Sequence, residues 1–102
     1  MDNRQAPEAA IKYAVFVKEK NPGIKKIYLF GSHANGTSND NSDIDIAFVF
    51  GDLSDAFDMQ VELMKLRRRF DTRIEPHPFS ESEFNSSHPL ANEILKNGLE
   101  IA

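Results

Sequence analysis

Residues 31–50 read GSHANGTSNDNSDIDIAFVF, and the expected fold follows from this stretch. A Gly-Ser turn comes directly after an apolar run that ends at Phe30. A polar loop, residues 36–42, follows, and Asp43 and Asp45 then begin a second apolar run. Short apolar runs bounded by turn residues are typical of strands. The stretch therefore predicts two strands that are joined by a turn and a polar loop.

The spacing of the two aspartates indicates a shared role. Residues i and i+2 of a strand point to the same side of the sheet, about 6.5 Å apart along the chain. Asp43 and Asp45 would therefore lie on one face, and Ile44 and Ile46 on the other. Two carboxylates this close repel each other unless a cation lies between them, and Mg²⁺ is commonly bound by one or two carboxylates plus substrate phosphates. Solvated charges at the edge of a strand are the alternative for such a pair.

The Gly-Ser turn favours a bound phosphate. Gly31 permits a positive φ angle or a close approach of the backbone to a ligand. Ser32 is expected to cap a short helix that reaches Asn35, and the first backbone N–H groups of such a helix would bind phosphate. An isolated Gly-Ser is more often an ordinary turn. Its position between an apolar run and the two aspartates is what favours the phosphate site.

Together these residues carry a family resemblance. The motif G-S-x-A-x-G at residues 31–36, followed after five residues by S-D-x-D at 42–45, resembles the signature of the DNA polymerase β-like nucleotidyltransferase superfamily. At usual residue frequencies, seven specified positions match by chance on the order of once in 10⁸ windows. Within the superfamily, the chain is similar to minimal nucleotidyltransferase (MNT) domains. The resemblance implies an α/β fold, a small mixed sheet of three or four strands with helices mainly on one face, as in the polymerase β palm. We expect the other face to be an open cleft that holds the acidic residues of the site.

The resemblance also implies a set of site residues. Those that would bind the nucleotide phosphates are Gly31, Ser32, Gly36 and Ser42. Asp43 and Asp45 would hold two Mg²⁺ ions. Glu75 is the only acidic residue in the third expected strand, and the resemblance implies that it is the third metal-site carboxylate, which would also help to take the proton from the attacking hydroxyl. A surface Glu75 that pairs with Arg73 is the alternative. His77, on the same face, is a weaker candidate for a substrate contact or a proton shuttle.

The implied reaction moves a nucleoside monophosphate, AMP from ATP or the equivalent group of another nucleoside triphosphate, to a hydroxyl acceptor. Minimal family members commonly pair with a helical HEPN protein in toxin–antitoxin systems, and some adenylylate that partner on tyrosine. The alternative is a catalytically weak, antitoxin-like binding module that neutralises a HEPN partner by complex formation. Asn35 favours this alternative, because many relatives carry Arg or Lys before the second glycine.

Length, net charge and composition indicate the general class of the protein. A length of 102 residues predicts a single domain over residues 1–102. The net charge of −4 gives no strong nucleic-acid signal, since general nucleic-acid binders are usually basic. The chain has no cysteine and no apolar run that approaches 18 residues, so we expect a cytoplasmic protein without a membrane span. A sheet this small would be helped by association with another chain, including a second copy of itself.

Hydrophobic periodicity gives the expected elements. Helices are predicted over residues 6–20, 54–70 and 89–96, and strands over 25–30, 44–50 and 72–79. Ser54 should cap the second helix, and the basic run over residues 67–69 at its end is favoured by the helix dipole. The strand over 44–50 is nearly all apolar past Asp45, so it should be buried on both faces. Pro76 and Pro78 should break the third strand. The residues expected to face the core from the last two helices are Phe57, Val61, Leu63, Met64, Leu66, Phe70, Leu90, Ile94 and Leu95.

Overall fold

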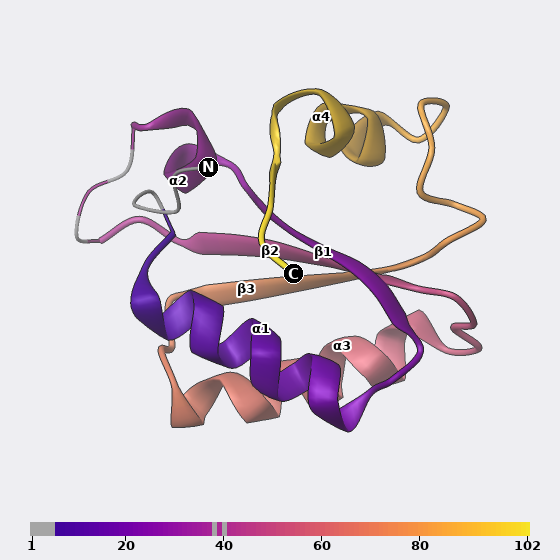
Figure 1. The fold of residues 1–102 in the computed structure, drawn as a ribbon, viewed down its shortest axis with the longest axis horizontal. Helices are drawn as coiled ribbons and strands as arrows, with labels where there is room; N and C mark the ends of the chain where they lie inside the picture. Colours follow the sequence, from indigo (N-terminus) through magenta and orange to yellow (C-terminus); the bar gives the residue numbers. More distant parts are fainter. Residues whose placement is uncertain (1–5, 38, 40) are drawn as a thin grey trace.

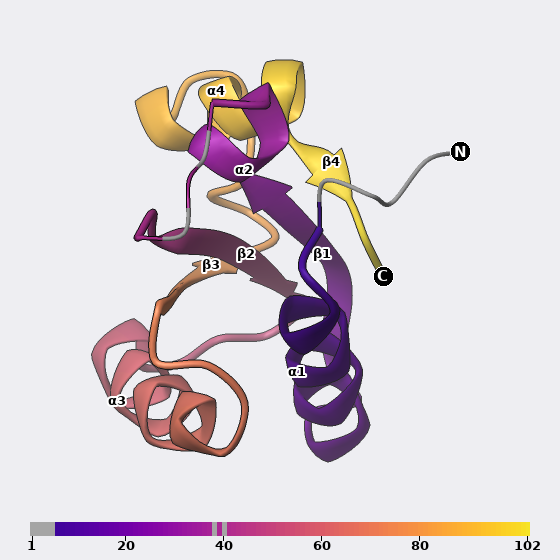
Figure 2. The ribbon, with the colours of Figure 1, turned by 90° about the vertical axis from the view of Figure 1, so that its left-hand side faces the viewer.

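The computed structural model describes residues 6–37, 39 and 41–102. In chain order the elements are α1 (Glu8–Lys20), β1 (Ile24–Phe30), α2 (Ser32–Asn35), β2 (Ile44–Phe50), α3 (Ala56–Leu66), a 3-10 turn (Arg67–Arg69), β3 (Ile74–Ser80), α4 (Pro89–Asn97) and β4 (Leu99–Glu100). The sheet separates α1 and α3, on one face, from α2 and α4, on the other (Figures 1 and 2). Among the described residues, no helix combines the length and the apolar character needed to cross a membrane.

The sheet is mixed and has the order β3-β2-β1-β4. β1 pairs antiparallel with β2 and with β4, whereas β2 pairs parallel with β3. A parallel pair needs a crossover connection, and α3 supplies it between β2 and β3. The α/β fold with a small mixed sheet is therefore confirmed. The two-residue β4 was not predicted, because so short a strand has no periodicity to read.

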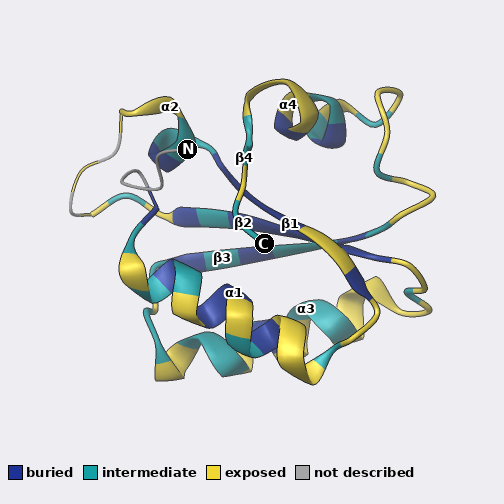
Figure 3. Cartoon of the chain, in the orientation of Figure 1, coloured by how far each residue is buried: buried dark blue, intermediate teal, exposed yellow. Residues whose placement is uncertain are grey.

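The larger core lies between the sheet and the two long helices. Alternate residues of β2 enter it, namely Ile44, Ile46, Phe48 and Phe50. They meet Tyr13 and Val17 of α1 and Leu63 of α3, all of which are buried. The strands are the most buried part of the molecule, and the helices expose their outer sides (Figure 3). The expectation that β2 is buried on both faces is confirmed, since only Asp45 in it is partly exposed.

A second core covers part of the opposite face, which the sequence led us to expect as an open cleft. Ala91 and Ile94 of α4 pack there against Tyr28 of β1, Val49 of β2 and Phe79 of β3. The expectation of a fully open face is therefore wrong. The apolar side chains that β1 and β2 direct to this face need cover, and α4 supplies it.

Two expectations about α3 are wrong. Asp55, and not Ser54, caps the helix, because its Oδ1 accepts a hydrogen bond from the Asp58 backbone N–H at 3.0 Å. Phe57 and Val61 do not face the core, and their exposed fractions are 75% and 37%. The helix is rotated so that Leu63 is buried and the half-buried Met59 and Leu66 flank it. On α4, Leu95 is likewise exposed instead of inward.

The two prolines do not break β3, which is a correction of the sequence-based expectation. The Ile44 N–H donates to the Arg73 carbonyl. In this parallel pair, the backbone N–H and C=O groups of the odd-numbered residues of β3 therefore point toward β2. Pro76 and Pro78 therefore direct their ring nitrogens toward the outer edge. A proline costs a strand nothing there, because no ladder hydrogen bond needs its missing N–H.

The outer edge of β3 is also covered by side chains of the crossover connection. Gln60 Nε2 donates to the Pro76 carbonyl at 2.6 Å. Arg67 Nη1 donates to the Ile74 carbonyl at 2.7 Å. These carbonyls would otherwise face solvent or another chain, so the two side chains complete the edge and fix α3 along β3.

Candidate functional site

The turn after β1 is framed by two glycines. Gly31 has a φ of 77° and stands at the N-cap of α2, and Gly36 has a φ of 76° at the C-cap. Positive φ angles are rarely adopted by other residues, so both glycines meet a backbone requirement. The expectation that Ser32 caps the helix is wrong, because Ser32 is its first residue and the cap makes no side-chain hydrogen bond.

Gly31 lies directly against the carboxylate of Asp45. Phe30 is the cross-strand partner of Asp45, so the residue after it sits at the carboxylate. A Cβ atom at Gly31 would come within 2.5 Å of Asp45 Oδ2, closer than any side chain tolerates. The glycine turn and the second aspartate therefore lie on the same side of the sheet.

The backbone also brings Asp45 and Glu75 to one face. The two residues are register partners across the parallel β2–β3 pair. Their neighbours Ile44 and Ile74 point into the core between the sheet and the helices α1 and α3, so the two acidic residues point the other way. Asp43 directly precedes β2 and is exposed. Because Asp43 lies outside the strand, its place on the same face as Asp45 stays a prediction from alternation.

The carboxylates have different partners in this structure. Asp45 Oδ1 is 3.2 Å from His77 Nε2. Glu75 Oε2 is 3.2 Å from Arg67 Nη1. Asp43 has no ion-pair or hydrogen-bond partner within residues 6–37, 39 and 41–102. Over the same ranges, no three His, Asp or Glu side chains come together in a way that could hold a metal.

Arg67 is the site residue that sequence reasoning missed. We attributed the Arg67–Arg69 run to the favourable helix dipole at the end of α3. Its contact with Glu75 depends on where α3 ends relative to β3, and no spacing in the sequence encodes that. His77 does lie at the site, where its ring packs edge-on against Phe30 with 5.0 Å between the ring centres.

The proposed surface pair between Glu75 and Arg73 does not form. Arg73 Nη2 binds Asp71 Oδ2 at 2.8 Å, and Arg73 Nε binds Oδ1 at 3.1 Å. The guanidinium hydrogen bonds hold the pKa of the Asp71 carboxyl below its usual value. Arg73 thus pairs with Asp71, and Glu75 forms its ion pair with Arg67.

Two further polar residues, Ser42 and His33, lie in the turn and the loop that follows it. Ser42 Oγ accepts a hydrogen bond from the Asn39 N–H at 2.9 Å and so closes the polar loop. His33 is buried, and its Nε2 has no hydrogen-bond partner among the residues that the structure describes. Ser38 and Asp40 of the same loop lie outside the described residues.

The acidic residues fit a hard divalent cation in their donor chemistry. All three offer carboxylate oxygens, which Mg²⁺ prefers. Asp43 is exposed and pairs with none of the residues that the structure describes, and Asp45 is partly exposed beside His77, so an ion could reach both. Glu75 would have to break its ion pair with Arg67 before it could bind the ion. The backbone arrangement therefore suits a metal, with Glu75 held back by its ion pair.

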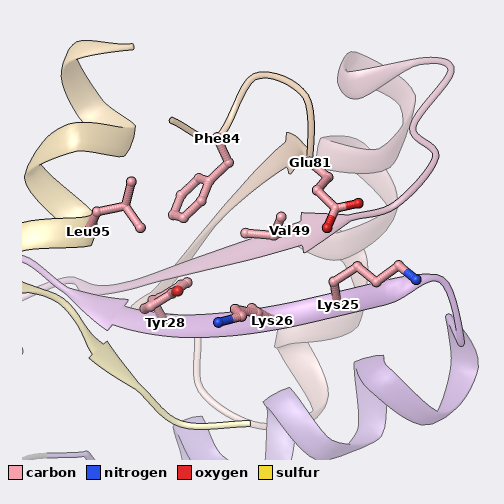
Figure 4. Close-up of a pocket in the computed structure, with 7 residues that line it drawn as sticks. All are labelled: Lys25, Lys26, Tyr28, Val49, Glu81, Phe84 and Leu95. Carbon is pink, nitrogen blue, oxygen red and sulfur yellow. The ribbon is translucent and has the colours of Figure 1, made fainter. Parts of the chain in front are cut away.

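One pocket lies away from the acidic face. It has a volume of about 200 Å³ and is lined by Lys25, Lys26, Tyr28, Val49, Glu81, Phe84 and Leu95 (Figure 4). Lys25 and Lys26 stand near the start of β1, whereas the carboxylates lie beside the end of that strand. The acidic site is therefore separate from this pocket.

Fold and site define a small α/β domain with an acidic face beside a glycine turn. The model of the family "Polymerase beta, Nucleotidyltransferase" matches residues 14–102. The chain therefore belongs to the polymerase beta nucleotidyltransferase family.

Known proteins of the same kind are similar to this chain. The protein adenylyltransferase MntA of Shewanella oneidensis is 36% identical over an alignment that covers 55% of this chain and 50% of that protein. The chain thus spans about half the length of this relative.

Solved structures agree on the fold. A protein from Sulfolobus solfataricus that is assigned to the nucleotidyltransferases superposes with a TM-score of 0.64 at 27% identity, over 91% of this chain and 76% of the other. A complex of the tri-AMPylated HEPN toxin of Shewanella oneidensis with its MNT antitoxin matches at a TM-score of 0.55 and 18% identity, over 92% and 71% of the two chains. At that identity the match speaks for the fold alone.

Proposed function

We propose that this chain is a metal-dependent nucleotidyltransferase that moves AMP from ATP to a hydroxyl group. The observation that carries the proposal is the register of the acidic face, in which Asp45 and Glu75 stand opposite each other beside Gly31. Family membership and the similarity to an adenylyltransferase support the same reaction.

The chain's own residues have distinct tasks in this reaction. The backbone from Gly31 to Gly36 would bind the triphosphate, and Ser32 and Ser42 line the same approach. In the transfer, the acceptor oxygen bonds to the α-phosphorus, the bond from that phosphorus to the bridging oxygen breaks, and pyrophosphate leaves. The acceptor's proton passes to a carboxylate, and Glu75 is our candidate for it.

Asp43, Asp45 and Glu75 would hold the divalent cation, for which we propose Mg²⁺ and two ions. When bound, such ions neutralise charge on the phosphoryl oxygens and orient the reacting groups. Positioning and charge are most of what nucleotidyl transfer requires of a protein. His77, at 3.2 Å from Asp45, would keep that carboxylate oriented.

For the acceptor we propose a tyrosine of a HEPN-type partner protein. The support comes from the complex of an AMPylated HEPN toxin with an MNT antitoxin, which has this fold. A partner protein that presents its own hydroxyl group at the acidic face would supply the acceptor.

The proposal is tested with ATP labelled at its α-phosphate, Mg²⁺ and a HEPN-type partner protein. We expect label on the HEPN protein, and a loss on the order of a hundredfold or more for Asp43→Asn. Asp43 is exposed, so the substitution should not disturb folding. The matched control is Asp52→Asn, an exposed aspartate in the turn after β2, which should label normally.

A second candidate is a binding module that neutralises its partner without transferring a nucleotide. The ion pair between Arg67 and Glu75 favours it, because it occupies one of the three carboxylates. The same experiment separates the two candidates. Tight complex formation without any label transfer, and with no rise in melting temperature on addition of Mg²⁺, would leave the binding module in place of the enzyme.

A further inference from the structure

The outer side of α3 carries an apolar stripe that the fold does not cover. Phe57 is 75% exposed and Val61 is 37% exposed, and the half-buried Met64 continues the line. Spacings of four and three residues place these side chains on one side of the helix. Leu63, on the opposite side, is fully buried. A contiguous exposed stripe of this kind marks an interaction surface more often than a scattered apolar residue does.

A hollow lies beside the C-terminal half of this stripe. Its volume is about 240 Å³. The lining residues are Gln60, Val61, Met64, Lys65, Arg67 and Arg68. The surface thus has a projecting aromatic ring at one end and, at the other, a recess lined by Val61 and Met64 together with Gln60 and basic side chains. Such a surface can be complementary to itself when two copies meet head to tail.

The two ends of α3 carry opposite charges beside the stripe. Asp58 lies near its beginning and Lys65 near its end, both exposed, and neither has an ion-pair partner in the described part of the chain. The two residues are seven apart, about two helical turns, so they flank the stripe on the same side. Their midpoint lies between Val61 and Glu62, one residue beyond the centre of the stripe, which lies between Gln60 and Val61.

We propose that α3 pairs antiparallel with α3 of a second copy of this chain, about a two-fold axis beside Val61. Asp58 of each copy then faces Lys65 of the other, and Phe57 of each copy enters the hollow beside Met64 of the other. An interface of this type uses one patch twice, which is the usual arrangement of symmetric dimers. Charge complementarity selects the antiparallel arrangement, because parallel helices would bring like charges together.

The pairing leaves the acidic face open and does not rest on the proposed nucleotidyl transfer. Asp45 and Glu75 lie on the sheet face opposite the core that α3 covers. A contact between two helices of 11 residues is at the small end of specific interfaces. We therefore expect a dissociation constant on the order of 10–100 µM.

The first test measures the molar mass of the intact chain by sedimentation between about 10 µM and about 1 mM, a range that brackets such a constant. The mass should rise from the 11.5 kDa of one chain toward twice that value. Phe57→Ser should weaken association about tenfold, since a buried aromatic anchor is lost. Val15→Ser on α1, where Val15 is 46% exposed, is the matched control and should not change it.

The second test exchanges charges and addresses the geometry directly. Asp58→Lys and Lys65→Asp should each weaken self-association about tenfold, because each places like charges opposite each other. An equal mixture of the two variants should associate as strongly as the unaltered chain, since the heterodimer restores both opposite-charge pairs. The chain that carries both substitutions should do the same, and circular dichroism checks that every variant is folded.

An unaltered chain that keeps a mass of 11.5 kDa over the whole range would overturn the proposal. So would a mixture of folded Asp58→Lys and Lys65→Asp chains that associates no better than either variant alone. In that second case, α3 would be the docking surface of a different protein, or self-association would use another face.

Discussion

At the scale of single residues, the backbone of Gly31 lies so close to the Asp45 carboxylate that there is no room for a side chain at position 31. The glycine has a φ of 77° and a ψ of −150°, a region that is almost closed to other residues. The carboxylate of Asp45 fills the space in which a Cβ atom would lie. One atom of side chain at position 31 would therefore strain the turn and displace an acidic group at the same time.

We predict that Gly31→Ala lowers the free energy of unfolding by about 2 kcal/mol, because the residue must hold a strained backbone angle. Label transfer should fall further than the loss of folded protein explains, since Asp45 is pushed aside. Urea denaturation and the labelling assay measure the two effects. Gly23→Ala is the control, because a Cβ atom there meets nothing within 4 Å, and its stability should change by less than about 0.5 kcal/mol. Equal effects at both glycines would contradict the explanation.

The sequence predicts candidate acidic residues for the site, but not their partners. The D-x-D spacing predicts that Asp43 and Asp45 share a face because strand alternation is a local rule, and the structure places Asp45, but not the preceding Asp43, within β2. The partner of Glu75 depends on how far the crossover helix runs before it turns back. That is a property of the folded molecule, so Arg67 could not be identified from any motif.

At the scale of elements, α1 and α3 are joined by one buried hydrogen bond. The Tyr13 hydroxyl of α1 donates to the Leu63 carbonyl of α3 at 2.7 Å. Burial raises the pKa of this hydroxyl well above its ordinary value of 10.0. The proton must therefore stay on Tyr13 as long as the two helices remain packed.

We predict that Tyr13→Phe lowers the free energy of unfolding by about 1 kcal/mol at neutral pH, since one buried hydrogen bond is lost. The pH dependence should change as well. Above pH 10 the unfolded chain loses the Tyr13 proton while the folded chain keeps it, so stability falls as the pH rises. This decline should be shallower in Tyr13→Phe. Tyr28→Phe is the control in the same denaturation series, and an identical alkaline slope in all three proteins would refute the assignment.

Element types are readable from this sequence, whereas their rotation is not. The positions of α1, β1, β2 and α4 follow from periodicity and turn residues. The periodicity of α3 is ambiguous, because Phe57 and Leu63 are both apolar and only one of them can face the sheet. Contact with β3 through Gln60 and Arg67 decides the rotation. The prolines of β3 misled us because a single sequence does not reveal which strand lies at the edge.

At the scale of the whole molecule, the sheet has a core on each face. The smaller core depends on α4, whose Ile94 is 1% exposed. The next residue, Leu95, is 47% exposed. Two neighbouring apolar residues of equal size therefore differ completely in what they contribute.

We predict that Ile94→Ala lowers the free energy of unfolding by about 3 kcal/mol, through lost burial and the cavity that remains. For a domain of this size such a loss is a large part of the total stability. Leu95→Ala should change it by less than about 0.5 kcal/mol. Thermal denaturation of both variants measures the difference. Similar melting temperatures would show that the packing of α4 on the sheet does not stabilise the fold.

The two borders of the sheet have a consequence for how this protein can meet others. One border is the proline-containing β3, whose outward carbonyls are held by Gln60 and Arg67, and the other is β4, only two residues long. In the described part of the chain, neither border offers a long free run of main-chain donors and acceptors onto which a foreign strand could add. We therefore expect partners to contact side chains of this molecule, so that its recognition could be altered one substitution at a time.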